Sequence, residues 1–361
     1  MTSNQDDLPE SSSDERSASP APSLYSFSSS VDGQFMLRQV HGRVLNSAND
    51  TYFLPADNEE HRRLDLQHQI LTLALGGLYP APDLVRRALR SRPLKAPGIL
   101  DVGTGSGSWA IDMARHFPHC NVVGVDLVPP RVDGQGPTAQ LSVCLHVSTS
   151  FPAGPLNTRP FASFEIDDAN LGFSHYRETF DLIHGRAINS GIRDYPQFLE
   201  SLAEALRPGG VVIVGDGDMQ LFDEWQQPLS YVEEGAPGFS WTHRMFFAAY
   251  NAMKNRGGSI DSPSMCPTWL RAIDAYTDVG WHKVFIPIGP WRQNVSPRER
   301  LIAEMLREDC LRYIAGLTPL LLSEGYLPES VEMMQREASA ELRELRVRIY
   351  SRWTFAWAVK K

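Results

Sequence analysis

The sequence predicts an α/β fold, in which a mostly parallel β-sheet carries helices on both faces. Two observations support this prediction. From residue 98 onward, short apolar runs alternate with helical patterns, which is typical of parallel strands joined by crossover helices. The run 211–216, VVIVGD, is almost continuously apolar, as expected of a strand that is covered on both faces. Seven strands are expected, at 98–102, 121–127, 164–166, 180–185, 211–216, 281–289 and 347–360.

Composition excludes several classes of function. The 361 residues include 34 Lys and Arg against 43 Asp and Glu, which gives a formal net charge of −9. A broad basic surface for nucleic acid is therefore not expected. No apolar run approaches the ~18 residues of a membrane span, and the N-terminus lacks the apolar stretch of a secretory signal. We therefore expect a cytoplasmic protein without membrane attachment. The four cysteines form no C-x-x-C pair and the chain has no H-E-x-x-H motif, so no metal site is predicted.

The residues before the sheet divide into two parts. Residues 1–33 hold 11 serines and six acidic side chains against a single arginine, which predicts a disordered leader. Residues 34–97 are expected to form a helical cap. In this cap, Asp57 is suited to start a first helix that Gly76 ends, and a second helix is expected at 83–91.

The later chain is expected to complete the same domain. Within the sheet region, 98–216, the proline-rich stretch 128–163 is interpreted mostly as an irregular excursion. Residues 217–361 are expected to supply helices that cover a substrate site, together with the last two strands. Helices are expected at 109–117, 195–206, 239–254, 267–278, 297–322 and 328–345.

One glycine-rich stretch carries most of the functional information. Asp101 ends the first strand, and the small residues that follow it are Gly103, Thr104, Gly105, Ser106 and Gly107. Glycines let the backbone turn sharply and approach a ligand, and the next helix presents free N–H groups to an anionic group. The second strand ends at Asp126, 19 residues beyond Gly107, where a carboxylate can accept hydrogen bonds from both ribose hydroxyls of an adenosine.

A nicotinamide-dependent oxidoreductase is the rival interpretation of this stretch. Its G-x-G-x-x-G pattern, started at Gly103, needs a small third residue at 108 for helix packing. Here Ser108 is followed by Trp109, and the third glycine falls one place early. Asp101 would also repel a pyrophosphate, whereas it can hold the ammonium group of a cofactor that carries an amino acid. The pattern therefore favours an adenosyl amino-acid cofactor.

With these residues the sequence resembles the class I S-adenosylmethionine-dependent methyltransferases. DVGTGSG matches their D-x-G-x-G-x-G signature, FEIDDA at 164–169 resembles their adenine loop, and LRPGGVVIVGD at 206–216 resembles their fifth-strand motif. The resemblance implies a Rossmann-like fold that ends in an antiparallel strand pair with a helical insertion, and S-adenosylmethionine as cofactor. The residues that it assigns to the cofactor are Asp101, Gly103, Thr104, Gly105, Gly107, Asp126, Leu127, Asp167, Asp168 and Tyr52.

A narrower resemblance adds the stretch 52–68, YFLPADNEEHRRLDLQH. Together with the later motifs it looks like the fungal LaeA-like methyltransferases, which include enzymes of natural-product pathways and regulators that act beside velvet proteins. Two functions stay open. One is methyl transfer to an oxygen or nitrogen of a small-molecule acceptor in secondary metabolism. The other is regulation in the nucleus through protein partners, which the acidic leader favours.

The acceptor site is harder to assign, because methyl transfer needs mainly alignment and the exclusion of water. His184 follows the fourth strand and could act as a general base, although a structural hydrogen bond is as good an interpretation. The helix after Tyr52 is expected to fold over the cofactor. Residues assigned to the acceptor are Arg186, Trp241, His243 and Phe247, and the last three would also suit a helix face buried in the core.

Overall fold

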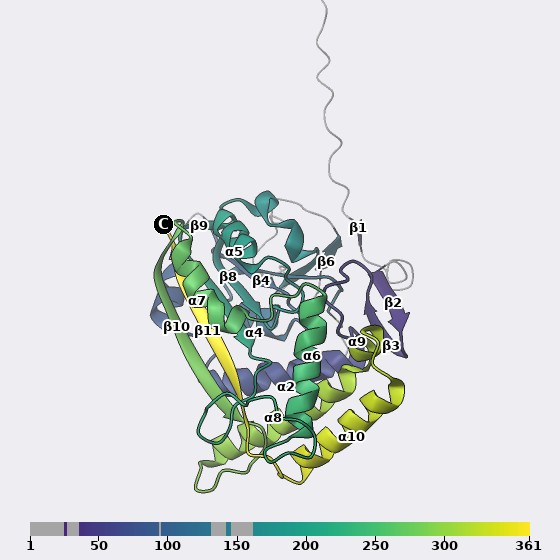
Figure 1. The fold of residues 1–361 in the computed structure, drawn as a ribbon. Coiled ribbons are helices and arrows are strands. Elements are labelled where there is room, and N and C mark those ends of the chain that lie inside the picture. The colour runs from purple at the N-terminus through teal and green to yellow at the C-terminus, as the bar shows by residue number, and fades with distance from the viewer. Residues whose placement is uncertain (1–24, 27–35, 94, 131–141, 146–161) are drawn as a thin grey trace, which may run out of the picture.

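The computed structural model describes residues 25–26, 36–93, 95–130, 142–145 and 162–361, arranged as Figure 1 shows. The predicted leader, 1–33, thus lies outside the described residues, apart from the two-residue strand β1 (Tyr25–Ser26). Most of the predicted excursion, 128–163, lies outside them as well. Its described part contains β6 (Ser142–Leu145), a strand that the sequence analysis missed.

The described strands form one main sheet of nine, in the order β1-β6-β7-β5-β4-β8-β9-β11-β10. Neighbours from β6 to β9 are parallel, whereas β1, β11 and β10 lie antiparallel to their neighbours. The bounds are β4 (Gly98–Val102), β5 (Asn121–Asp126), β7 (Ser163–Ile166), β8 (Phe180–Arg186), β9 (Leu206–Gly217), β10 (Tyr276–Pro287) and β11 (Tyr350–Lys360). The run from β7 to β10 confirms the predicted seven-stranded, Rossmann-like sheet, and β6 and β1 extend it at one edge.

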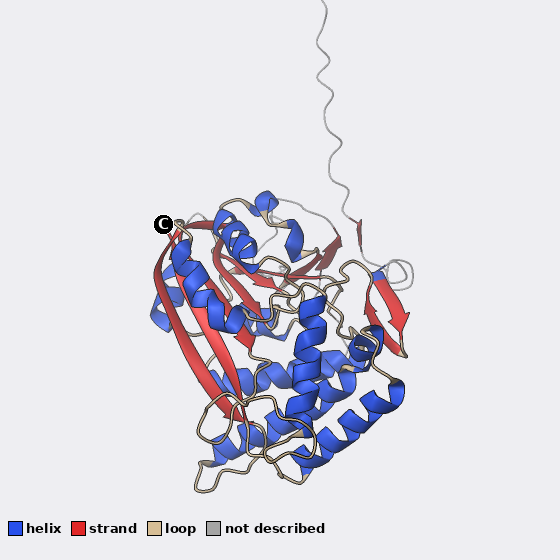
Figure 2. Ribbon diagram, in the orientation of Figure 1, coloured by secondary structure: helices blue, strands red, loops and turns tan. Residues whose placement is uncertain are grey.

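Alternate residues of the central strands face opposite layers of helices, as the pleat of a strand requires. Leu100 and Val212 pack into a core with helices α5 (Tyr195–Ala205) and α7 (Ser262–Ala272). Their neighbours Ile99 and Val211 pack on the other face with α3 (Pro82–Ala88) and α4 (Ser108–His116). Figure 2 shows helices on both sides of the sheet. The strands are therefore buried on both faces, which explains their unbroken apolar sequences.

A third group of helices packs against residues of β10 and β11, in the lower half of Figure 1. Their bounds are α2 (Asn58–Leu75), α6 (Trp241–Asn255), α8 (Pro297–Gly316), α9 (Thr318–Ser323) and α10 (Pro328–Arg343). The side chain of Asp57 accepts a hydrogen bond from the backbone N–H of Glu60, so Asp57 is the N-cap of α2 as predicted. Helices α8, α9 and α10 form the expected insertion between the last two strands. None of the helices in the described part is long and apolar enough to cross a membrane.

Two local elements differ from the sequence-based expectation. A hairpin of β2 (Leu37–Val40) and β3 (Arg43–Asn46) precedes α2, in a stretch that was expected to belong to a helical cap. Its turn residues, His41 and Gly42, both have positive φ angles (46° and 78°). The helix expected at 267–278 is instead α7, and Tyr276 already begins β10. Pro267, which had been taken as a helix start, lies inside α7.

Candidate functional site

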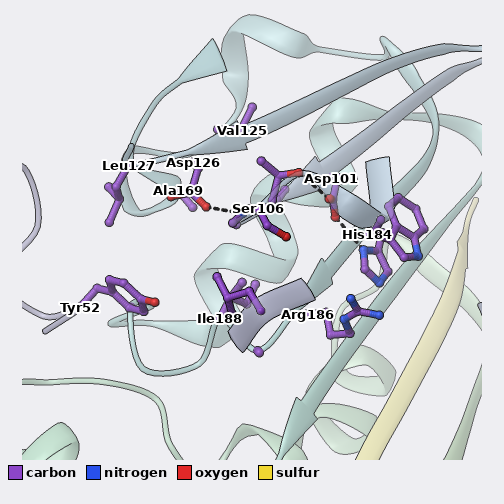
Figure 3. Close-up of a pocket in the computed structure, with 18 of the residues that line it drawn as sticks. Tyr52, Asp101, Ser106, Val125, Asp126, Leu127, Ala169, His184, Arg186 and Ile188 are labelled. Carbon is purple, nitrogen blue, oxygen red and sulfur yellow. Dashed lines mark hydrogen bonds and ion pairs between the residues drawn. The ribbon is translucent and has the colours of Figure 1, made fainter. Parts of the chain in front are cut away.

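A cavity of about 900 Å³, its open mouth included, lies where β4, β5 and β8 end. The carboxyl ends of parallel strands meet at one edge of a sheet, and ligands of such folds bind there. Figure 3 shows the side chains of three neighbouring strands around it, with Tyr52 on the side opposite Asp101 and His184. The residues that line this cavity include Asn49, Tyr52, Leu64, Gln67, His68, Asp101, Gly103, Thr104, Gly105, Trp109, Asp126, Leu127, Asp167, Asp168, His184, Arg186, Ala187 and Ile188.

The glycine-rich turn forms one wall of this cavity. Gly103 and Gly105 have φ angles of 66° and 56°, in the left-handed region that favours glycine. A Cβ on Gly103 would lie 2.4 Å from Cγ2 of Ile188, and one on Gly105 would lie 2.9 Å from Cδ1 of Leu64. The N–H groups of Gly103 and Thr104 both donate to the carbonyl of Val125, at 2.8 and 3.0 Å. The turn is therefore anchored on β5, and it needs glycine for conformation and for space.

Asp126, the last residue of β5, is half-buried at the cavity wall and fixed by backbone donors. Its Oδ2 accepts a hydrogen bond from the N–H of Gly105 at 2.7 Å, and its Oδ1 accepts one from Val128 at 3.3 Å. Burial raises the pKa of this carboxyl, and these backbone hydrogen bonds oppose the rise. The hydrogen bond from Gly105 therefore orients the carboxylate of Asp126 relative to the glycine turn. A carboxylate held in this way can accept hydrogen bonds from a pair of neighbouring hydroxyls.

Asp101 and His184 form a buried pair on the adjacent strands β4 and β8. His184 Nδ1 lies 2.7 Å from Asp101 Oδ1, and the hydroxyl of Thr104 donates to Asp101 Oδ2 at 2.7 Å. The ring of His184 stacks on Trp109 with 3.8 Å between the centroids. Burial lowers the pKa of His184, so the ring is neutral at pH 7 and its Nδ1–H donates to the carboxylate. These contacts hold the side chains of Asp101 and His184 in place in the cavity wall.

A second chain of contacts joins β8 to the helix above the cavity. Arg186 Nη2 lies 3.1 Å from Nδ1 of His68 on α2, and His68 Nε2 lies 3.0 Å from Oδ2 of Asp112. Burial lowers the pKa of the Arg186 guanidinium to about 10, so it still carries its charge at pH 7. Among the described residues no carboxylate forms an ion pair with Arg186. Within the described part of the chain, Arg186 therefore lines the cavity as a cation without a carboxylate ion-pair partner.

The loop around Tyr52 closes the opposite side. Asn49 holds this loop, because its Oδ1 accepts hydrogen bonds from the backbone of Thr51 and Tyr52, while its Nδ2 donates to Asp168 Oδ1 at 3.2 Å. Asp168 also caps the short 3₁₀ helix η2 (Ala169–Leu171). Its carboxylate is thus committed to local structure, whereas the neighbouring Asp167 accepts from the backbone N–H of Asp168 and lies 3.7 Å from His175.

The loop after β8 depends on a residue whose role the sequence analysis did not identify. Asp216, at the end of β9, accepts hydrogen bonds from the backbone N–H of Ile188 at 2.9 Å and from the hydroxyl of Tyr195 at 2.6 Å. Ala187 in this loop has a positive φ of 57°, which is unusual for a residue with a side chain. Asp216 therefore holds the loop that separates two cavities of the protein.

The second cavity adjoins the first through a shared wall made of Tyr52, Leu64, Gln67 and Ala187. It lies among α2, α6, α8 and the ends of β9 and β11. Its further lining consists mainly of apolar and aromatic side chains: Leu54, Met219, Phe246, Met253, Leu306, Tyr313 and Trp353. The cavity is also lined by three charged residues, Arg63, Asp218 and Asp309, and by the polar residues Asn189, Ser190 and Ser351.

The cavities can be compared with the residues predicted from the sequence. Of the predicted cofactor residues, Gly107 alone does not line the first cavity, since it is the N-cap of α4. His184 and Arg186 line the first cavity as well. Trp241, His243 and Phe247 line neither cavity, and α6 reaches the second one through Phe246 and Met253 instead. Sequence reasoning also missed Asn49, Gln67 and Ile188. Asn49 and Ile188 lie outside the motifs, and Gln67 lies in the stretch 52–68 but was given no role.

Comparison with known proteins fits this geometry. Residues 66–249 match the sequence model of a methyltransferase domain family. The protein is 32% identical to "Secondary metabolism regulator laeA" of Coprinopsis cinerea, over 87% of this chain and 72% of the relative. The chain belongs to the class I S-adenosylmethionine-dependent methyltransferases. It is also 26% identical to "Methyltransferase pytC" of Aspergillus terreus, over 82% of this chain and 78% of that one. Its identity to "Methyltransferase str2" of Strobilurus tenacellus is 25%, over 87% of this chain and 98% of that one.

The residues of the first cavity fit the cofactor of this family. Asp126 offers carboxylate oxygens to which ribose hydroxyls could donate, and Gly103 and Gly105 add no side chain to the cavity wall. Near Asp101, the unpaired guanidinium of Arg186 offers a partner for a carboxylate such as that of a methionine group. When bound, S-adenosylmethionine supplies a methyl group that its sulfonium charge already activates. The protein needs mainly to hold the acceptor in line and to exclude water.

Proposed function

We propose that this methyltransferase transfers a methyl group to an oxygen or nitrogen atom of a small-molecule acceptor in fungal secondary metabolism. The observation that carries the proposal is the second cavity. It shares the wall Tyr52, Leu64, Gln67 and Ala187 with the first, and the rest of its surface is mostly apolar and aromatic. Such a lining with a few placed polar groups is typical of small-molecule sites.

Within this proposal the chain divides the work between two sets of residues. Asp126, the glycine turn, Leu127 and Asp167 would hold the adenosyl part, and Arg186 with Asp101 would hold the amino-acid part. We assign His184 to positioning, because its Nδ1 is engaged by Asp101 and its ring is stacked on Trp109. Catalysis by His184 as a general base stays a prediction. The free energy of unfolding and the methyl-transfer activity of His184→Ala separate it from a positioning role.

A direct test uses methyl-labelled S-adenosylmethionine and a small-molecule extract of a fungal culture. We expect the purified protein to move the label into one or a few small molecules that are separable by chromatography. A matched reaction with Asp126→Ala should lose most of this product. Label that stays in the cofactor, although the protein binds S-adenosylhomocysteine, would contradict the proposal.

A second candidate function is supported by the relatives rather than by the cavities. The chain is 32% identical to a protein named as a secondary metabolism regulator, and its leader is acidic and rich in serine. A regulator of this kind would act in the nucleus through protein partners. The same labelling reaction separates the two functions. A regulator that methylates protein would transfer the label to macromolecules, and a regulator that acts without methyl transfer would leave the label in the cofactor.

A further inference from the structure

A buried charged cluster lies in the wall of the second cavity. Arg63 on α2 shares its single Nε–H between both carboxylate oxygens of Glu60, at 3.0 and 3.1 Å, and donates from Nη2 to Glu60 Oε1 at 2.7 Å. Its Nη1 donates to Asp309 Oδ1 on α8 at 3.1 Å. The side chains of Arg63, Glu60 and Asp309 are only 5%, 4% and 7% exposed. This cluster is therefore almost completely removed from bulk water.

The charges of this cluster do not balance. Two carboxylates share the single guanidinium of Arg63: Glu60 accepts from Nε and Nη2, and Asp309 accepts from Nη1. The other acid that lines the cavity, Asp218, is neutralised by Arg352, which donates to it at 2.8 and 2.9 Å. Among the described residues no hydrogen bond reaches Oδ2 of Asp309. The cavity thus contains about one excess negative charge, located at Asp309.

The neighbours of Asp309 do not supply the missing positive charge. Burial raises the pKa of Cys310 and Tyr313, so both stay neutral near pH 7. Arg312, which also acts on Asp309, points to the surface and pairs with Glu308 at 2.8 Å. Burial raises the pKa of the Asp309 carboxyl to about 6, with Arg63 opposing the rise and Glu60 adding to it. A buried carboxylate with an open oxygen needs a hydrogen-bond donor, which water or a ligand in the cavity can supply.

We propose that the second cavity selects the methyl acceptor by charge. It binds a compact, mostly apolar molecule that is neutral or cationic and whose O–H or N–H group donates a hydrogen bond to Asp309 Oδ2. It rejects molecules that carry a carboxylate or a phosphate. The proposal rests on the proposed function, since it defines the acceptor of the same site. An anionic ligand would bring a like charge next to a desolvated carboxylate, and the repulsion would weaken its binding. A hydroxyl or ammonium group instead completes the hydrogen bonds of Asp309.

Three probes of the same shape test the selection by charge: 4-ethylphenol, tyramine and 4-hydroxyphenylacetate, which are neutral, cationic and anionic. Their dissociation constants are measured by ligand-observed NMR on the full chain saturated with S-adenosylhomocysteine, at pH 7.5. We expect 4-ethylphenol and tyramine to bind, and 4-hydroxyphenylacetate to bind at least about tenfold more weakly. Met219→Trp, which fills the cavity, should abolish binding of all three and leave the affinity for S-adenosylhomocysteine unchanged.

Two variants on one helix locate the charge. Asp309→Asn keeps the shape of the side chain and should bring the three probes to within about threefold of one another. Glu304→Gln removes an exposed charge from the same helix and should leave the discrimination as in the wild type. If Asp309→Asn fails to fold, the wild type gives the same information, because discrimination against 4-hydroxyphenylacetate should narrow as the pH falls through about 6.

The other possible results would overturn the charge selection, the second cavity as acceptor site, or the proposed function. Equal binding of 4-hydroxyphenylacetate and 4-ethylphenol by the wild type, or an unchanged preference in Asp309→Asn, would overturn the charge selection. Absence of binding by all three probes, with S-adenosylhomocysteine bound, would overturn the second cavity as an acceptor site. Failure to bind S-adenosylhomocysteine would instead overturn the proposed function, so the two failures are distinguishable.

Discussion

Replacing Asp126 by Ala should weaken cofactor binding without unfolding the protein. In the structure this carboxylate is held by the N–H of Gly105 at 2.7 Å, and it faces the cavity where two ribose hydroxyls would donate. Hydrogen bonds to a charged acceptor contribute about 1.5–3 kcal/mol, and losing them should raise the dissociation constant about 10- to 150-fold. The N–H of Gly105 also loses its acceptor, which loosens the turn and places the expected effect in the upper half of this range.

Isothermal titration calorimetry with S-adenosylhomocysteine measures this effect directly. Asp126→Asn keeps an acceptor oxygen for Gly105 and should lose less affinity than Asp126→Ala. Asp83→Ala is the matched control, since it removes an acid whose side chain is 87% exposed and which pairs with the surface residue Arg86. An unchanged dissociation constant in Asp126→Ala would refute the assignment of this residue to the ribose.

Three further predictions concern stability and the leader. Because the pKa of Asp309 is about 6 in the folded protein against 3.8 for an ordinary Asp, its protonated form favours folding. The wild type should therefore be most stable relative to Asp309→Asn at pH 4 and lose this advantage as the pH rises through 6. Urea unfolding from pH 4 to 8 measures the difference in free energy of unfolding between the two proteins, and a difference that does not change with pH would contradict the prediction. His184→Ala removes the donor to Oδ1 of the buried Asp101, whose Oδ2 keeps the hydroxyl of Thr104, and should lower the free energy of unfolding by about 2–3 kcal/mol. Unchanged stability with lost methyl transfer would favour a general base at this position. Deleting residues 1–33 should leave the melting temperature nearly unchanged, and a drop of many degrees would show that the leader is folded.

The sheet and the cofactor residues could be predicted because their signals are local. The strand β4, the glycine turn and the end of β5 lie within one short stretch of sequence, and each residue type there has a physical reason to be present. Gly103 and Gly105 adopt positive φ angles, and Asp126 accepts a hydrogen bond from the turn. The N-cap Asp57 was likewise predictable, since it needs only its own helix.

The residues of the second cavity could not be predicted because they are brought together from distant segments. Asp309 contacts Arg63, which lies 246 positions earlier in the chain. Arg63 belongs to the stretch 52–68, but Asp309 belongs to no motif, so the sequence did not indicate that the two meet. On α6, aromatic side chains occupy more than one face of the helix. Phe246 is buried and lines the cavity, whereas its neighbour Phe247 is 38% exposed and contacts Tyr231. Adjacent helical positions differ by about 100°, so the sequence alone did not determine which aromatic residue faces inward.

Turn conformation explains the missed hairpin. The turn of β2 and β3 uses His41 and Gly42, both with positive φ, although Asn-Gly and Asp-Gly are the usual sequences for such turns. Histidine is one of the few non-glycine residues that are enriched in this conformation. The strands are only four residues long, so the alternation of apolar and polar positions was too short to indicate them.

The central claim is that the first cavity holds the adenosyl cofactor and that the second holds the acceptor across the wall formed by Tyr52 and Ala187. A crystal structure of the complex with S-adenosylhomocysteine tests it most directly. We predict that both ribose hydroxyls lie within hydrogen-bond distance of Asp126 and that the sulfur atom faces this wall. A ligand bound elsewhere, or a sulfur atom that points away from the second cavity, would contradict the claim.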